Sequence, residues 1–339
     1  MVVSAGVLAT SRIQIRTVDS RPAYANLAQD VRAGLSGENK QLPPKYFYDA
    51  HGSVLFDQIC NTREYYPTRI ENGLLARYAS DIIQRTCPEL IVELGSGSSR
   101  KTIHLLDACD QLAVCPTYQP VDICREMLLA AGTRLLQNYD WLEIEGVVGD
   151  YCENLSEMPA EAASRLFVFL GGTLGNFDEQ ASNSFLRTLY SEMGRDDWLL
   201  MGVDRVKAPE VLNAAYNDTE GYTAAFNRNV LSVINRELDG QFDLHSFEHH
   251  AWFNEARSRI EMHLKSTVSQ KVRIKDLDME IEFSENETIL TEISRKFTFD
   301  SLSLLLRQNG FELVHHYEPD NGYFSLVLAK ANAIIDCDR

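Results

Sequence analysis

The sequence predicts an α/β fold built on a mostly parallel, doubly wound sheet. From about residue 88 onward, short apolar runs alternate with longer amphipathic stretches, which is the pattern of repeated strand and helix units. The first apolar run leads into a glycine-rich turn that opens a helix. Near the C-terminus, the turn sequence EPDNG at residues 318–322 joins two apolar runs and predicts an antiparallel hairpin.

The strand and helix units can be followed in order. Apolar runs predict strands at Leu90–Leu94, Thr117–Val121, Leu142–Val148, Leu166–Leu170 and Trp198–Val203. Apolar residues at intervals of three and four predict helices between them, at Lys101–Asp107, Arg125–Leu136 and Gln180–Met193. The pattern resumes with a helix at Asp300–Asn309 and with the hairpin runs Phe311–Tyr317 and Tyr323–Ala329. We therefore predict a Rossmann-like core with a seven-stranded sheet.

Two segments find no place in this predicted sheet. Residues 206–290 are polar, rich in Asn and Tyr, and contain short helix-like and strand-like pieces of their own. Residues 1–70 are punctuated by Pro43, Pro44 and Pro67. We expect these two segments, 1–70 and 206–290, to form a discontinuous α+β substrate-binding domain. The core would then comprise residues 71–205 and 291–339.

Composition narrows the class of partner. The 339 residues are 45% apolar, which is enough to bury a full core, and the formal net charge of −17 would repel a phosphate backbone or an anionic membrane. No run approaches the roughly 18 apolar residues of a spanning helix, and no secretory signal is apparent. We expect a cytoplasmic monomer that acts on a small molecule, with no nucleic-acid or membrane partner.

A metal site is not expected. The cysteines are seven in number and scattered, with no CxxC pair, so we interpret them as reduced thiols. His245 and His249 are spaced at i and i+4 with Glu248 between them, which would suit a metal pair only if that stretch were a helix. No third ligand is apparent in the sequence.

The turn VELGSGSSRKT, residues 92–102, predicts a cofactor site. Gly95, Ser96 and Gly97 let bare backbone approach a ligand, and the helix that follows favours an anionic group such as a carboxylate. A dinucleotide fingerprint needs a third glycine and an acid about 20 residues on, but this loop has Arg100, and the next strand-end acid, Asp122, lies further away. The loop therefore favours S-adenosylmethionine, although by itself it does not exclude a dinucleotide.

Polar residues at the ends of the next strands strengthen this interpretation. Asp122 could bind both hydroxyls of a ribose, while Asp150 could accept the adenine amino group and Tyr151 could pack on the ring. The fourth strand runs into LGGTLGN, residues 170–176, whose glycines let the chain pass beside a reactive sulfonium. Asn176 could hold a substrate amine there, or it could cap the next helix. Together these features predict S-adenosylmethionine-dependent methyl transfer to a small molecule.

Longer motifs resemble a known family. The stretch LPPKYFYDAHGSVLFDQICNTREYYPTR, residues 42–69, is similar to the N-terminal signature of the histidine-specific Nα-methyltransferases of ergothioneine biosynthesis. The resemblance continues through LGSGSSRKT, FLGGTLGN, AYNDTEGYTAAFNRNVL and TEISRKF, and it covers roughly residues 40–330. It implies a class I methyltransferase core that trimethylates the α-amine of L-histidine, through mono- and dimethyl intermediates, to hercynine, with S-adenosylhomocysteine as by-product.

The resemblance also implies roles for individual residues. The substrate amine and carboxylate would be held by Tyr65, Asn176 and Tyr216, of which Tyr65 and Asn176 would be catalytic. Glu292 and Ser294 would read the imidazole. Met262 would line the pocket around the ring. The matched cofactor positions are Tyr48, Gly95, Lys101, Asp122, Asp150 and Tyr151, with Tyr151 standing where a phenylalanine is expected.

The residue types themselves fit this substrate. A carboxylate such as Glu292 beside a hydroxyl such as Ser294 matches the donor and acceptor nitrogens of an imidazole. Methyl transfer needs alignment more than a strong base, and Tyr65 could both orient the neutral amine and face a methylated ammonium. Two alternatives stay open, which are Nα-methylation of another aromatic amino acid such as tryptophan and a non-catalytic sensor or scaffold that binds S-adenosylmethionine.

Overall fold

A computed structural model describes residues 12–18, 26–153, 155 and 162–332, and its largest element is an eight-stranded sheet. The strand order is β1-β5-β4-β3-β6-β7-β14-β13. The strands are β1 (Ile13–Thr17), β3 (Leu90–Leu94), β4 (Thr117–Asp122), β5 (Ile144–Val148), β6 (Arg165–Phe169), β7 (Trp198–Asp204), β13 (Phe311–Tyr317) and β14 (Phe324–Ala331). All neighbours from β1 to β7 pair in parallel, whereas β14 is antiparallel to both β7 and β13. The predicted mostly parallel sheet with a C-terminal hairpin is confirmed.

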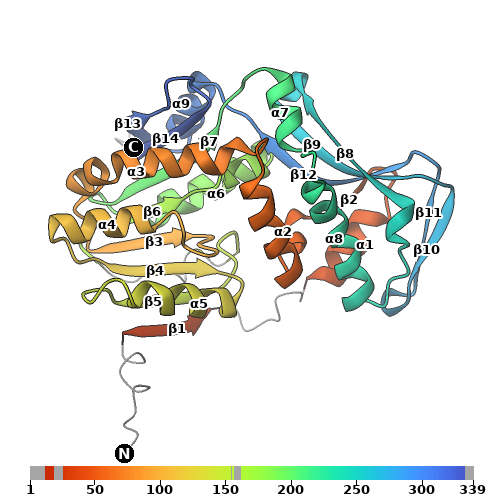
Figure 1. Cartoon of the computed structure of the whole chain (residues 1–339), viewed down its shortest axis with the longest axis horizontal. Coiled ribbons are helices and arrows are strands. Elements are labelled where there is room, and N and C mark those ends of the chain that lie inside the picture. The colour runs from red at the N-terminus through yellow and green to blue at the C-terminus, as the bar shows by residue number, and fades with distance from the viewer. Residues whose placement is uncertain (1–11, 19–25, 154, 156–161, 333–339) are drawn as a thin grey trace, which may run out of the picture.

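Strand β1 corrects the prediction of seven strands and of a residue 1–70 segment wholly outside the sheet. Ile13–Thr17 pairs in parallel with β5 and forms one edge of the sheet (Figure 1). The two isoleucines of β1 pack against glycines that have no side chain to obstruct them. A Cβ on Gly132 would lie 2.5 Å from Ile13, and a Cβ on Gly146 would lie 3.0 Å from Ile15. The sequence could not reveal this pairing, since β1 and β5 are far apart in the chain.

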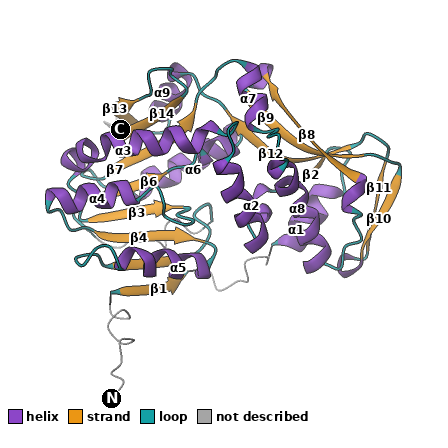
Figure 2. Cartoon of the chain, in the orientation of Figure 1, coloured by secondary structure: helices purple, strands orange, loops and turns teal. Residues whose placement is uncertain are grey.

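Helices cover both faces of the large sheet (Figure 2). One face packs against α3 (Tyr66–Thr86), α4 (Ile103–Leu112) and α5 (Arg125–Leu136), and the other packs against α6 (Glu179–Glu192) and α9 (Phe299–Gln308). Alternate residues of β3 supply the two cores, with Ile91 on the first side and Leu90 and Val92 on the second. The four predicted core helices are confirmed as α4, α5, α6 and α9, of which α5 has the predicted ends and the others are shifted by one to five residues, whereas α3 was not predicted.

A second, four-stranded sheet lies beyond the carboxyl ends of the parallel strands, where the arrowheads of β3 and β4 point toward α2 (Figure 1). It has the order β2-β12-β9-β8, and a separate ribbon pairs β10 with β11. These strands are β2 (Lys40–Gln41), β8 (Phe247–Asn254), β9 (Arg259–Ser266), β10 (Gln270–Ile274), β11 (Met279–Phe283) and β12 (Thr288–Arg295). The accompanying helices are α1 (Leu27–Leu35), α2 (Ala50–Asn61), α7 (Pro209–Ala215) and α8 (Tyr222–Glu237).

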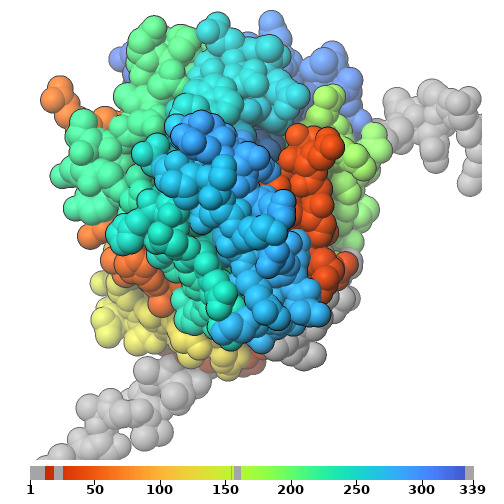
Figure 3. Space-filling model, turned by 90° about the vertical axis from the view of Figure 1, so that its right-hand side faces the viewer, coloured from red at the N-terminus to blue at the C-terminus, as the bar shows by residue number. Residues whose placement is uncertain are grey.

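The two segments expected to cover the substrate share one apolar core. This core draws on residues from Leu27 to Tyr66 and from Leu212 to Ile289. Figure 3 shows the teal-to-blue later segment beside orange-red N-terminal residues on one face of the molecule. The predicted boundaries at 70 and 290 do not match element ends, because α3 begins at Tyr66 and β12 continues to Arg295. The division into two domains stays a prediction, and residues 333–339 of the predicted core lie outside the described part.

Two further observations concern a membrane-spanning helix and a metal site, both of which were considered from the sequence. Within the described ranges, no helix has both the length and the apolar character needed to cross a membrane. His245 lies in a 3-10 turn, Leu244–Ser246, and His249 lies in β8, so the helix on which a metal pair depended is absent there. The described residues hold no group of three or more His, Cys, Asp or Glu arranged for a metal ion.

Candidate active site

The glycine loop after β3 lies over the end of β4. The backbone N–H groups of Gly95 and Ser96 both donate to Val121 O, at 2.9 and 3.1 Å. Gly95 and Gly97 have φ of +72° and +48°, a region that disfavours side chains. A Cβ on Gly95 would also lie 3.3 Å from the ring of Tyr151. The loop therefore leaves bare backbone facing the residues at the ends of β4 and β5.

Asp122 ties this loop to β4. Its Oδ2 accepts from Gly97 N at 2.8 Å and its Oδ1 accepts from Cys124 N at 2.9 Å. Burial raises the pKa of Asp122, while these N–H groups oppose the rise. Each carboxylate oxygen keeps a second lone pair, so both oxygens can still accept a ligand hydroxyl.

Asp150 and Tyr151 follow β5 beside the loop. Asp150 Oδ1 accepts from Cys152 N at 2.8 Å, and the Tyr151 ring meets Phe169 edge to face at 5.6 Å. Burial raises the pKa of Tyr151 well above its ordinary value, so the phenol is neutral. Tyr48 is 37% exposed, its ring meets those of Phe56 and Phe226 edge to face, and it lies near Tyr151. The structure thus brings together the predicted cofactor residues.

Glu71 of α3 is a functional candidate that the sequence analysis missed. It is 1% exposed, it pairs with the ammonium of Lys101, and both of its oxygens accept from Gly171 N, at 2.9 and 3.0 Å. Glu71 therefore connects the glycine loop to the LGGTLGN loop after β6. A signal was available, because Glu71 precedes Leu74 and Leu75 by three and four residues and so lies on the buried face of the helix.

The LGGTLGN loop carries Asn176 toward the second sheet. Its 3-10 turn, Thr173–Asn176, packs on β12 so closely that a Cβ on Gly175 would lie 3.4 Å from Ser294 Oγ. Asn176 does not cap the next helix, because the side chain of Asp178 accepts from Ala181 N at 2.8 Å in that role. In the part of the chain that the structure describes, the Asn176 amide has no hydrogen-bond partner.

The predicted substrate residues converge on this loop. Pro67 lies in the first turn of α3 and fixes the start of the helix, so Tyr65 is its N-terminal cap. The side chain of Tyr65 is 9% exposed, and the centroid of its ring lies 6.1 Å from that of Tyr216. Glu292 of β12 pairs directly with Met262 of β9. Burial raises the pKa of Tyr65 well above its ordinary value, and nearby acidic groups add to the rise. Tyr65 and Tyr216 are therefore both uncharged and contribute neutral aromatic rings to the site.

Burial also determines the pKa of Glu292, whose side chain is 9% exposed. It raises the pKa of Glu292 to about 7, with the positive charge of Lys296 acting in the opposite direction. No described residue donates a hydrogen bond to its carboxyl group. At neutral pH this carboxyl group is therefore poised between its two protonation states and is open to a ligand.

A buried ionic network behind these residues was also missed. Lys296 donates to Tyr216 Oη at 3.0 Å and to Ser294 Oγ at 2.8 Å, and it pairs with Asp204 at 3.0 Å. Lys207 pairs with the same carboxylate. Glu292, Ser294 and Lys296 are spaced at i, i+2 and i+4 along β12 and its end, so the period of a strand could have placed Lys296 on the face of the two predicted residues.

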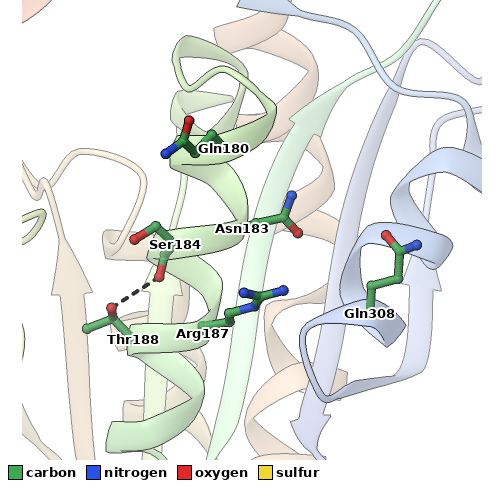
Figure 4. A pocket seen from close by; sticks show the side chains of 6 residues that line it. All are labelled: Gln180, Asn183, Ser184, Arg187, Thr188 and Gln308. Atoms are coloured by element: carbon green, nitrogen blue, oxygen red, sulfur yellow. Dashed lines mark hydrogen bonds between the residues drawn. The ribbon is translucent and has the colours of Figure 1, made fainter.

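A polar hollow on the outside of α6 is not part of this site. It is lined by Gln180, Asn183, Ser184, Arg187, Thr188 and Gln308, and Thr188 Oγ1 donates to Ser184 O at 3.1 Å (Figure 4). None of the predicted site residues lines it. Its walls are polar side chains of α6 together with Gln308 of α9.

A glycine loop after the first core strand, acids at the ends of the next two strands and an antiparallel C-terminal hairpin define a class I S-adenosylmethionine-dependent methyltransferase. The buried Ser96 Oγ, which has no partner among the described residues, suits a site that receives a polar cofactor there. Residues 27–331 match the family described as histidine-specific methyltransferase, SAM-dependent. The chain belongs to this family and is an S-adenosylmethionine-dependent methyltransferase.

Relatives of the chain agree with this assignment. It is 44% identical over 303 residues to the histidine N-alpha-methyltransferase of Mycolicibacterium smegmatis, which covers 89% of this chain and 94% of the relative. It is 29% identical over 290 residues to ergothioneine biosynthesis protein 1 of Schizosaccharomyces pombe, covering 82% of this chain and 37% of that protein. An L-tryptophan methyltransferase of Psilocybe serbica is 26% identical over 324 residues, covering 87% and 89%.

Proposed function

We propose that this enzyme transfers three methyl groups to the α-amino group of L-histidine and forms hercynine, the first step of ergothioneine biosynthesis. One observation carries the proposal. An open buried carboxyl group, Glu292, and a hydroxyl, Ser294, share one strand face, and the loop that carries Asn176 packs beside Ser294. A donor and acceptor pair of this kind matches an imidazole, and the amide suits an amino acid's polar end.

The cofactor would be held by the loop and strand ends already described. The backbone of Gly95, Ser96 and Gly97 would receive its carboxylate end, and Asp122 would accept from the ribose hydroxyls. The remaining contacts would come from Lys101, Tyr48, Asp150 and Tyr151. When bound, S-adenosylmethionine supplies an electrophilic methyl group on a sulfonium.

The protein's contribution is alignment and desolvation. Methyl transfer to an amine is an in-line displacement, so the neutral amine must be held with its lone pair toward the methyl group. Tyr65 and Asn176 would hold it in this way, and water would carry the displaced proton away. The rings of Tyr65 and Tyr216, 6.1 Å apart and nearly perpendicular, would face the positive charge after each transfer. Such faces retain mono- and dimethylhistidine after N–H donors have been lost.

The proposed enzyme has a substrate-binding domain, acts as a monomer and works in the cytoplasm. The segments that share the second core would act as the substrate-binding domain, with Met262 against the imidazole. The small-molecule substrate requires no second subunit, and we propose a monomer. The described cysteines are all free thiols, which suits the reducing cytoplasm.

A substrate screen tests the function. Purified protein is incubated with S-adenosylmethionine and each of the twenty amino acids in turn, and mass spectrometry detects products that carry one, two or three added methyl groups. We expect trimethylated histidine. Methylation of tryptophan without histidine would support the first alternative, and cofactor binding without any product would support the sensor or scaffold alternative.

A further inference from the structure

Lys296 is a buried lysine that the proposed reaction does not use directly. Its side chain is 1% exposed. Its ammonium has three hydrogens and no lone pair, and three oxygens surround it, those of Asp204, Tyr216 and Ser294, at 3.0, 3.0 and 2.8 Å. All of its donors are therefore used inside the protein. Lys296 has no hydrogen left for a substrate and can act only through its neighbours.

The first consequence of this arrangement of Lys296 concerns the hydrogen bonds that Ser294 accepts and donates. Ser294 Oγ accepts from Lys296 and also from the Tyr216 hydroxyl, at 2.8 Å in each case. A serine oxygen has two lone pairs, so both are occupied. Because the phenol of Tyr216 is the more acidic of the two hydroxyls and acts as the donor of that pair, the hydrogen of Ser294 has no other acceptor among the described residues. Ser294 therefore offers the pocket a donor and no acceptor.

The second consequence concerns Glu292, whose ionisation is favoured by the positive charge of Lys296. Glu292 lies on the same strand face, and Lys296 supplies the positive charge that favours its ionised form against burial. An ionised Glu292 is an acceptor only. When Glu292 is ionised, the pair on the strand face therefore presents one donor and one acceptor, which is the complement of a neutral imidazole with one N–H and one bare nitrogen.

We propose that Lys296 is a positioning residue that makes this pocket selective for a neutral imidazole, by fixing Ser294 as a donor and Glu292 as an acceptor. This inference rests on the proposed function, because it assumes that the ring of histidine meets these two residues. An imidazolium has no bare nitrogen for Ser294, and an indole has none either. Both rings leave the Ser294 hydrogen without a partner in a buried site.

The chain offers a matched control in Lys207. Its side chain is 4% exposed and it pairs with the same Asp204 carboxylate. Its other hydrogen bonds run to Tyr66 Oη at 2.7 Å and to Arg205 O at 2.6 Å, neither of which is a proposed substrate residue. Lys207→Met therefore removes a buried cation of the same network without touching Ser294, Tyr216 or Glu292.

The experiment compares Lys296→Met, Lys207→Met and the wild-type full chain. Dissociation constants for histidine and for β-(2-thienyl)alanine, whose five-membered ring has no nitrogen, are measured with S-adenosylhomocysteine present. We expect Lys296→Met to weaken histidine binding about tenfold or more while thienylalanine binding changes little, so that the preference collapses. Histidine turnover should show the loss mainly in KM. Lys207→Met should keep the wild-type preference.

Equal weakening of both ligands by Lys296→Met, or an equal loss of preference in Lys207→Met, would overturn the inference. If Lys296→Met does not fold, Lys296→Gln serves, since it keeps an N–H donor but no charge. The acidic limb of its pH profile for kcat/KM with histidine should move to higher pH, and an unmoved limb counts against the proposal. Wild-type protein that methylates no histidine would refute the proposed function instead, before any variant is compared.

Discussion

Replacing Glu292 by glutamine should raise stability and lower activity together. The folded-state pKa of Glu292 is about 7, against an ordinary value of 4.5, because the side chain is buried. Between these two pH values the unfolded chain releases a proton that the folded chain keeps, so the stability contribution of Glu292 falls as pH rises through this window. The full difference corresponds to roughly 3 kcal/mol, reached above about pH 7 and small below about pH 4.5.

Glutamine has nearly the same shape and does not titrate, so Glu292→Gln should avoid this loss. In urea unfolding we expect the variant to exceed wild type by about 3 kcal/mol at pH 8 and by under about 1 kcal/mol at pH 5. Histidine kcat/KM should fall about 10- to 100-fold, because the acceptor for the ring N–H loses its charge. The control is Glu280→Gln on β11, whose pair with Lys271 is exposed, and it should change neither quantity.

The pH dependence of the stability difference is the decisive part of this experiment. A gain that is equal at pH 5 and pH 8 would mean that Glu292 does not titrate in this window, and the reasoning about its burial would be refuted. A variant with unchanged histidine kcat/KM would remove Glu292 from the substrate pocket, whatever its stability.

Further predictions concern the amine, the cofactor and the packing behind the loops. Tyr65→Phe should lower kcat about tenfold or more, with little change in histidine affinity, in single-turnover assays; unchanged turnover would exclude the phenol from the reaction. Asp122→Asn should weaken S-adenosylhomocysteine binding about tenfold or more by calorimetry, with an unaltered circular dichroism spectrum, and equal affinity would exclude a ribose contact. Gly202→Ala places a Cβ 1.9 Å from Glu71 Oε1 and should cost about 1–3 kcal/mol in urea unfolding, whereas Gly73→Ala on α3, with nothing within 4 Å, should stabilise by up to about 1 kcal/mol.

Local patterns explain which elements could be predicted. Strand β3 and helix α5 have the predicted ends because periodicity, glycine and turn chemistry all lie within a few residues of each boundary. Strand β1 could not be found in this way, since five residues of modest alternation gain their partner only when β5 is already in the sheet. The hydrophobic pattern also set the domain boundary at 70 inside α3, because Pro67 resembled an interruption and is in fact the first turn of the helix.

The site was predictable where a motif ends a strand and not where burial creates the chemistry. Asp122 is the last residue of β4 and Asp150 comes just after β5, so their places at one sheet edge follow from the parallel topology. In the sequence, no motif marks Glu71 or Lys296 as functional, and only the period of a helix or a strand places them on an inward face. They become structural only because α3 and β12 are pressed against loops from distant parts of the chain.

Asp204 shows why such residues stay ionised inside the protein. Burial alone would raise its pKa, but Lys296 and Lys207 hold it below its ordinary value, and Tyr66 donates to it at 2.7 Å. Asp204 ends β7 of the large sheet, whereas Lys296 follows β12 of the second. One carboxylate thus fixes the distance between the strand that borders the cofactor edge and the strand that carries Glu292 and Ser294. Because an in-line transfer slows about 100-fold when the two reactants are misplaced by about an ångström, this ion pair has a reason to be retained even if an apolar pair would be as stable.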